Sequence, residues 1–157
     1  MSYAETSPSY RLKDLVSSQT VRAKVAVRDW EEATEIAGSL LIQSGVALPE
    51  YIAAMKRVLK EMGPYAVIAP GIVLLHARPE DGVLKPGLAM VTLSTPVNFG
   101  HTENDPVDLV FALAATDKTS HLQGLQELAQ LLSDGEVLKG LRSAQTDEEL
   151  LKIVHST

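Results

Sequence analysis

The feature that most constrains the fold is a series of short apolar segments in the middle of the chain, with helical periodicity on either side. Four segments are apolar and bounded by Pro, Gly, Asp or Asn: Tyr65–Ala69, Ile72–Leu75, Gly87–Leu93 and Val107–Ala115. Segments of this length and composition are typical of β-strands. A further strand is predicted at Val21–Val27, where apolar and polar residues alternate.

Helical patterns precede and follow these strands. After Asp29, a typical N-cap, apolar residues recur with helical spacing from Trp30 to Leu41, and Gly45 ends that helix. The other helices are predicted over Pro49–Gly63, Ser120–Leu132, Tyr10–Ser17, Gly135–Leu141 and the residues after Thr146. Since strands mix with helices and no linker or repeat divides them, residues 1–157 predict a single α/β domain. Its central sheet is expected to be covered by helices on both sides, and residues 1–9 to be flexible.

Composition narrows the classes of function. The chain has no cysteine, which excludes disulfides, thiolate zinc sites and thiol nucleophiles. Its formal net charge of -6 disfavours nucleic acid and anionic membranes as main partners. The longest apolar stretch, Ala66–Leu75, is broken by Pro70 and Gly71, so it is too short to span a bilayer. The N-terminal residues lack the pattern of a secretory signal, and a cytoplasmic location is expected.

His76 is the first candidate for chemistry. It ends the apolar run GIVLL and begins the polar turn ARPEDG. A strand that leads directly into a turn puts its last side chain at the edge of the sheet, where sites gather in α/β folds. An imidazole there is partly exposed and can act as a nucleophile. The alternative is an amphipathic residue at a strand end with no chemical role.

His121 is the second candidate. It follows the strand VDLVFALAATD, and Ser120 and Gln123 have the spacing of a capping box, so Ser120 is the predicted N-cap and His121 the first helical residue. Free N–H groups at a helix start bind anions. Together with His76, this arrangement suggests a phosphate site, to which Arg78 or Lys85 could add positive charge. The alternatives are a surface histidine and solvated surface cations.

The two remaining histidines are weaker candidates. His101 lies in the turn-rich stretch GHTENDPVD, where a turn role is the simplest interpretation, and His155 lies at a helix end near the C-terminus. A metal site of His76, His101 and His121 is conceivable, but no HxH or HxxxH pair supports it, so no metal is expected. The sequence also has no Walker loop, GxGxxG motif or GxSxG elbow, and no cofactor is expected.

Two long segments resemble a known family. GPYAVIAPGIVLLHARPEDGVLKPGLAMVTL resembles the active-site region of phosphotransferase system EIIA domains of the mannitol/fructose type. NFGHTENDPVDLVFALAATDKTSHLQGLQELAQLL resembles the second half of that domain, and HTENDPVDLVFALAATD is similar to its ascorbate-specific branch. The resemblance extends from about Leu12 to Val154 and brings both histidine contexts in the family's order.

This resemblance implies a mixed sheet flanked by helices and a cytoplasmic phosphoryl carrier in sugar uptake, acting as a phosphotransferase. His76 matches the histidine that accepts phosphate from the phosphocarrier protein HPr and passes it to the cognate EIIB. His121 matches the second histidine, which supports the phosphoryl group, and Ser120 and Arg78 are the expected phosphate-binding residues. The membrane component EIIC would move the sugar, and a homodimer is compatible with the sequence.

The chain departs from many relatives beside the first histidine, where Leu75 and Ala77 replace proline and glycine. An arginine that many mannitol-type relatives carry late in the preceding helix has no evident counterpart, although Arg57 and Lys60 lie nearby. Two alternatives stay open. One is a regulatory EIIA of the nitrogen type, and the other is a non-catalytic binding module of the same fold.

Overall fold

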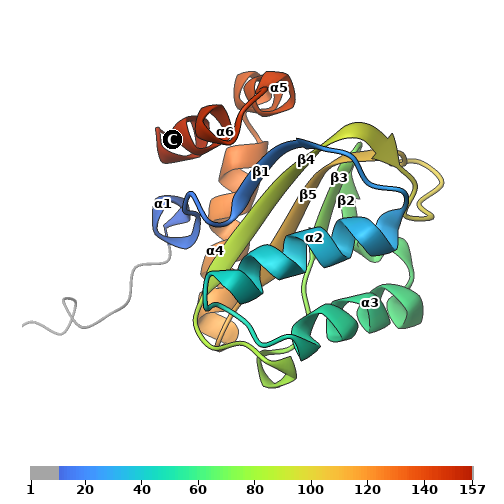
Figure 1. Cartoon of the computed structure of the whole chain (residues 1–157), viewed down its shortest axis with the longest axis vertical. Coiled ribbons are helices and arrows are strands. Elements are labelled where there is room, and N and C mark those ends of the chain that lie inside the picture. Colours follow the sequence, from blue (N-terminus) through green and yellow to red (C-terminus); the bar gives the residue numbers. More distant parts are fainter. Residues whose placement is uncertain (1–10, 157) are drawn as a thin grey trace, which may run out of the picture.

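A five-stranded mixed sheet forms the centre of the computed structural model, which describes residues 11–156 (Figure 1). The strands are β1 (Val21–Val25), β2 (Val67–Ala69), β3 (Ile72–Leu75), β4 (Gly87–Val97) and β5 (Val107–Ala114). Their spatial order is β1-β4-β5-β3-β2. The pairs β1–β4 and β3–β5 are parallel, whereas β4–β5 and β2–β3 are antiparallel.

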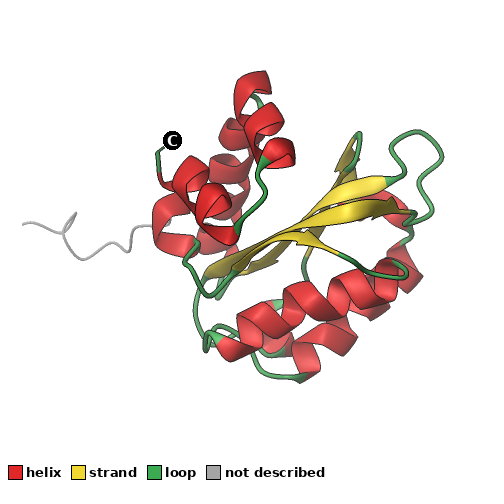
Figure 2. Cartoon of the chain, turned by 45° about the horizontal axis from the view of Figure 1, so that its top comes forward, coloured by secondary structure: helices red, strands yellow, loops and turns green. Residues whose placement is uncertain are grey.

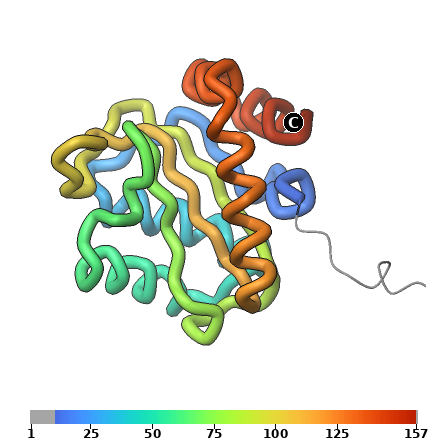
Figure 3. The backbone as a smooth tube through the Cα atoms, turned by 180° about the vertical axis from the view of Figure 1, so that it is seen from behind, coloured from blue at the N-terminus to red at the C-terminus, as the bar shows by residue number. Residues whose placement is uncertain are grey.

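Helices cover both faces of this sheet, as predicted (Figures 1 and 2). The helices α2 (Trp30–Gln43) and α3 (Glu50–Met62) lie on one face. The other face carries α1 (Leu12–Leu15), α4 (Lys118–Leu132), α5 (Gly135–Ser143) and α6 (Asp147–His155). Figure 3 views the molecule from this side, with α4 (orange) in front of the sheet. None of the helices within residues 11–156 has the length and apolar character needed to cross a bilayer.

Each face of the sheet has its own apolar core, because successive side chains of a strand point to opposite sides. In β3, Ile72 and Leu74 pack in the core beneath α4, whereas Val73 and Leu75 pack in the core beneath α2 and α3. Burial on both sides explains why these strands are continuously apolar. Continuing the alternation by one residue directs His76 to the same side as α4.

Several predicted boundaries are wrong by a few residues. The first strand ends at Val25 rather than Val27, beside an irregular register and a left-handed φ of 54° at Lys24. The fourth strand continues past Leu93 to Val97, because Val97 still pairs with Val107 although Ser94–Pro96 are exposed. Residues 1–9, predicted to be flexible, lie outside the described residues, as does Tyr10, the predicted start of the first helix. The helix α1 is only four residues long.

The turn before β3 is held by an ion pair from the C-terminal part of the chain. Arg142 of α5 donates from Nε to Asp108 Oδ2 at 2.9 Å and from Nη2 to Asp108 Oδ1 at 3.1 Å. The same Nη2 donates to the Pro70 carbonyl at 3.0 Å. Gly71 follows with φ +76°, and a Cβ there would lie 2.7 Å from Arg142 Nη2. This cluster sets the start of the strand that leads to His76.

Gly71→Ala should lower the free energy of unfolding by about 2 kcal/mol, because a Cβ is disfavoured at this φ and displaces the guanidinium from Asp108. Urea denaturation measures the change. Gly135→Ala is the matched control, since a Cβ there meets no atom within 4 Å, and it should shift the free energy by less than about 0.5 kcal/mol. Equal effects of the two substitutions would refute this role for the turn.

Candidate functional site

The two candidate histidines meet at one edge of the sheet. β3 and β5 are parallel, with Leu75 opposite Ala112, so their carboxyl ends share that edge. His76 follows β3 directly, and His121 lies in the first turns of α4, which is separated from β5 by three residues. The ring centroids are 5.5 Å apart, and the ring planes are tilted by 46°. The fold therefore joins two side chains that lie 45 positions apart in the sequence.

Both rings line a surface pocket of about 390 Å³. The remaining lining residues come from α3, from the segment after β3 and from the start of α4: Val58, Ala77, Arg78, Pro79, Ala115, Asp117 and Lys118. The walls are thus mainly apolar, while the charged groups lie in exposed positions. Such a site can hold a small charged group against two half-buried imidazoles.

The surroundings of His76 identify its free nitrogen. Its Nδ1 lies 3.3 Å from the backbone oxygen of Leu74. A carbonyl oxygen only accepts, so this contact requires the proton of a neutral ring to be on Nδ1. The lone pair is then on Nε2, which is available to act as a nucleophile.

His121 has a lowered pKa. Burial of the ring is the main cause, because it disfavours the charged imidazolium, and the neighbouring His76 adds a smaller Coulombic effect. The neutral form of His121 therefore predominates at pH 7. A neutral ring keeps one N–H donor, which can bond to an oxygen atom held between the two histidines.

The start of α4 differs from the prediction that Ser120 is the N-cap and His121 the first helical residue. Asp117 is the N-cap, and its Oδ1 accepts from the Ser120 N–H at 2.8 Å. Ser120 returns the interaction, since its Oγ accepts from the Asp117 N–H at 3.2 Å. The Ser120 side chain is buried, and its backbone N–H is already satisfied. Aspartate caps as well as serine does, and DKTS has the spacing of a capping box, which was the missed signal.

The cations of the site also differ from expectation. Arg78 lines the pocket, but its side chain is 72% exposed and pairs with Asp81, 3.3 Å from Arg78 Nε to the carboxylate. Lys85 does not line it. Lys118, which the sequence did not single out, lines the pocket and makes no ion pair with any residue among 11–156. Lys118 is the first residue of α4, directly after the N-cap Asp117. With Ser120 predicted as the cap, the sequence placed Lys118 before the helix and gave no reason to assign it to the site.

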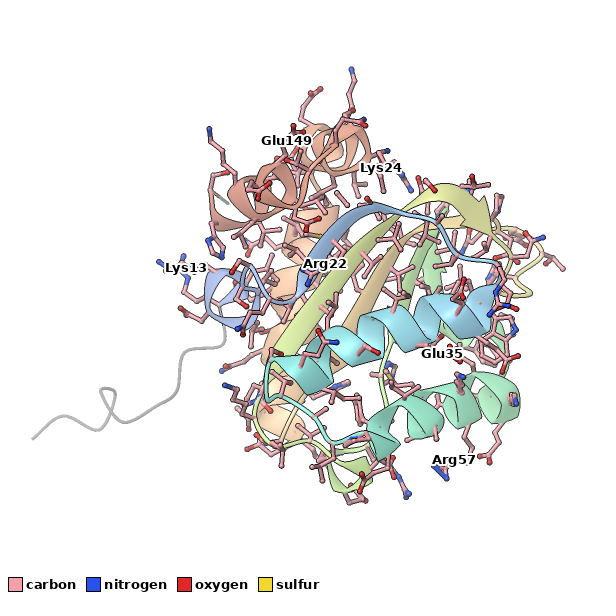
Figure 4. All side chains as sticks on the ribbon, in the orientation of Figure 1. Lys13, Arg22, Lys24, Glu35, Arg57 and Glu149 are labelled. Atoms are coloured by element: carbon pink, nitrogen blue, oxygen red, sulfur yellow. The ribbon has the colours of Figure 1, made fainter. Side chains whose placement is uncertain are left out.

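None of the basic residues of α3, which are Lys56, Arg57 and Lys60, lines the pocket. Val58 is the α3 residue that lines the pocket. Arg57, one residue earlier, points away from the sheet and into solvent in Figure 4, and Lys60 is exposed. Adjacent residues of a helix lie about 100° apart around its axis, and Arg57 is not among the residues that line the pocket.

The other two histidines lie elsewhere. His101 Nδ1 accepts from the backbone N–H groups of Glu103 at 3.2 Å and Asn104 at 3.0 Å, which confirms its turn role. His155 Nε2 contacts the Val16 carbonyl at 3.0 Å and holds α6 near the first helix. Across residues 11–156, no three His, Cys, Asp or Glu side chains gather in an arrangement that could hold a metal ion.

Comparison with known proteins gives a consistent result. The family described as "Phosphoenolpyruvate-dependent sugar phosphotransferase system, EIIA 2" matches residues 14–157. The ascorbate-specific PTS system EIIA component of Escherichia coli K12 is 37% identical over 149 residues, which are 94% of this chain and 97% of that protein.

Two solved structures extend the comparison to the fold. The mannitol-specific cryptic phosphotransferase enzyme IIA CmtB of E. coli has a TM-score of 0.83 and 32% identity, covering 94% of this chain and 99% of that one. The mannitol enzyme IIA of E. coli, solved in complex with phosphorylated enzyme IIB, has a TM-score of 0.79 and 27% identity, covering 90% and 98% of the two chains. This chain therefore belongs to the EIIA 2 family of the phosphoenolpyruvate-dependent sugar phosphotransferase system.

Proposed function

We propose that His76 carries a phosphoryl group, which it accepts from phospho-HPr and passes to a cognate EIIB. The observation that supports this most directly is the pairing of the two rings, at 5.5 Å between centroids, in a pocket open to the surface. One ring offers a free Nε2, and the other stays neutral and keeps a donor. Membership of the EIIA family supports the same chemistry.

In the proposed transfer, the lone pair on His76 Nε2 attacks the phosphorus of phospho-HPr. The new N–P bond forms as the bond from phosphorus to the donor atom breaks, and the donor atom keeps that electron pair. The proton on His76 Nδ1 stays at the Leu74 carbonyl, which orients the ring. A nucleophile of EIIB then attacks the same phosphorus from the opposite side and releases His76 as a neutral ring.

His121 would support the phosphoryl group by donating to one of its oxygens. A transferred phosphoryl group needs little covalent help from the protein, so positioning and charge stabilisation account for most of the catalysis. The N–H of His121 and the ammonium of Lys118 would supply that stabilisation. Arg78 would contribute less, because Asp81 and Glu80 already offset its charge.

Membership of the family supports the proposed partners. The complex of the mannitol enzyme IIA with phosphorylated enzyme IIB supports an EIIB as the partner of this chain, and transfer from His76 would require it to dock over the pocket. The identity to the ascorbate-specific component supports ascorbate as the sugar of the system, with this chain acting in the cytoplasm and a separate EIIC moving the substrate.

Replacing each histidine tests the carrier role. The protein is incubated with enzyme I, HPr and phosphoenolpyruvate, and its intact mass is followed over time. The wild type should gain one acid-labile phosphate, His76→Ala should gain none, and His121→Ala should gain it about 10²-fold more slowly, since one stabilising donor is lost. His155→Ala, in α6 and outside the pocket, is the control and should behave as the wild type.

Phosphate on His76→Ala would disprove His76 as the acceptor. A folded wild type that stays unmodified beside active HPr would instead favour a non-catalytic binding module.

The pKa of His121 should report the phosphoryl group. In the free protein it lies below the ordinary value of 6.5 because of burial. The unfolded chain then binds a proton more readily, so the stability that this group contributes is present above pH 6.5 and is lost as the pH falls through the folded pKa. A phosphoryl dianion on His76 should raise the pKa of His121, because it favours the imidazolium. Titration by NMR, before and after phosphorylation, measures the change; an unchanged pKa would place the phosphate elsewhere.

Lys118 and Arg78 can be compared by matched substitutions. Lys118→Gln should slow phosphorylation about fivefold, since an exposed charge contributes up to roughly 1 kcal/mol. Arg78→Gln should slow it less than about twofold, because its partners already neutralise the guanidinium. Initial rates at fixed phospho-HPr give both values. A larger effect for Arg78 would assign it the main charge role that the sequence suggested.

A further inference from the structure

The regular pairing of the parallel strands β3 and β5 ends at Leu75, one residue before His76. Its register runs from Ile72 opposite Leu109 to Leu75 opposite Ala112, and the Leu109 N–H donates to the Gly71 carbonyl at 3.0 Å. Continuing this pattern along the strands brings the Ala77 N–H opposite the Leu113 carbonyl. The two groups do not bond directly, because a side-chain hydroxyl lies between them.

This hydroxyl belongs to Tyr51, the second residue of α3. Its oxygen accepts from the Ala77 N–H at 3.0 Å and donates to the Leu113 carbonyl at 2.8 Å. A further contact, to the Ala77 carbonyl, is 3.4 Å long. The hydroxyl thus takes the place of the next hydrogen bond of the ladder and satisfies both backbone groups while keeping them apart.

Tyr51 is held rigidly in this position. The residue is 1% exposed and packs in the core between the sheet and the helices α2 and α3. Burial raises the pKa of its hydroxyl to about 12. The hydroxyl therefore stays protonated at neutral pH and can donate a hydrogen bond. A buried hydroxyl that both accepts and donates fixes its two partners relative to each other.

The two partners belong to the two segments that carry the histidines. Ala77 directly follows His76, and Leu113 lies two residues before Ala115, from which the chain turns into α4 and His121. Both Ala77 and Ala115 line the pocket between the rings. If the ladder closed by one more bond, the Ala77 nitrogen and the Leu113 oxygen would approach to about 2.9 Å, and the base of the pocket would narrow.

We propose that Tyr51 is a positioning residue for phosphoryl transfer: its hydroxyl, inserted between Ala77 and Leu113, sets the spacing between the His76 and His121 segments. This inference rests on the proposed carrier function. It assigns a role to a side chain that does not touch the transferred group and that lies 25 positions before His76 in the sequence.

The test is Tyr51→Phe, which removes one oxygen and keeps the ring in the core. Tyr65→Phe is the matched control, because it makes the same chemical change at a side chain that is 82% exposed. In single-turnover phosphorylation by phospho-HPr, Tyr51→Phe should lower the maximal rate roughly tenfold or more and leave the half-saturating concentration of HPr unchanged. The NMR-titrated pKa of His121 should shift as well, since the separation from His76 changes. Tyr65→Phe should match the wild type in all three quantities.

A merely structural tyrosine would lower stability without moving the maximal rate or the pKa of His121, and that result would overturn the proposal. A wild type that is never phosphorylated would refute the carrier function instead. In that case, the pKa of His121 in Tyr51→Phe still decides whether the hydroxyl sets the spacing.

A measurement on the wild type covers the case in which Tyr51→Phe does not fold. The Ala77 amide proton should exchange with solvent at least about 10²-fold more slowly than a free loop amide, because Tyr51 holds it in the core. Exchange at the rate of a free amide would disprove the inserted hydroxyl.

Discussion

The parallel pairing of β3 with β5 is the constraint on which the site depends. Parallel strands place both carboxyl ends at one edge of the sheet, and here each of those ends leads to a histidine. The pairing also buries both faces of β3, so the alternation of side chains is unambiguous: Ile72 and Leu74 face α4, and His76 must follow them. A shift of one residue in the register would turn His76 toward α3 and away from His121. The geometry of the pocket is thus a consequence of core packing rather than of any local motif.

Hydrogen bonds from Arg142 hold β3 and β5 together at their opposite, amino-terminal ends. Asp108, at the start of β5, holds Arg142, which also reaches the carbonyl before Gly71. The edge strand β1 is protected in a related way, because the Asp147 carboxylate at the start of α6 accepts from the Ala23 N–H of β1 at 2.8 Å. The free backbone groups of an edge strand can pair with other chains, and this contact occupies one of them. The C-terminal helices therefore stabilise the start of β3 and β5 and the edge strand β1. The carboxyl ends of β3 and β5, where the histidines lie, stay accessible.

The charges around the pocket are compatible with the proposed phosphoryl group, although the chain has a net charge of -6. Two carboxylates at or beside the pocket accept hydrogen bonds from the protein: Asp117 lines the pocket and caps α4 through the Ser120 N–H, and Asp81 accepts from the backbone N–H of Arg78 at 2.9 Å. The pKa of Asp117 is lowered chiefly by the bond from the Ser120 backbone, and that of Asp81 chiefly by the side chain of Arg78. Both carboxylates are thus directed at donors of the protein, and of the two cations that line the pocket, Lys118 makes no ion pair with residues 11–156.

The sequence alone determined the class of fold, most of the elements and the two histidines, because these depend on local signals. Alternation and helical spacing show which segments are strands or helices, and a histidine at the end of an apolar run must lie at the edge of a sheet. The start of α4 was missed because Asp117 and Ser120 both suit a cap, and only the structure shows which of the two accepts from the helix. Tertiary structure alone decided the strand order, the 5.5 Å between the rings, the outward position of Arg57 and the hydrogen bonds of Tyr51. The Tyr51 hydroxyl meets partners 26 and 62 positions away in the sequence, and no periodicity or cap can encode a contact that exists only after the sheet and α3 have packed.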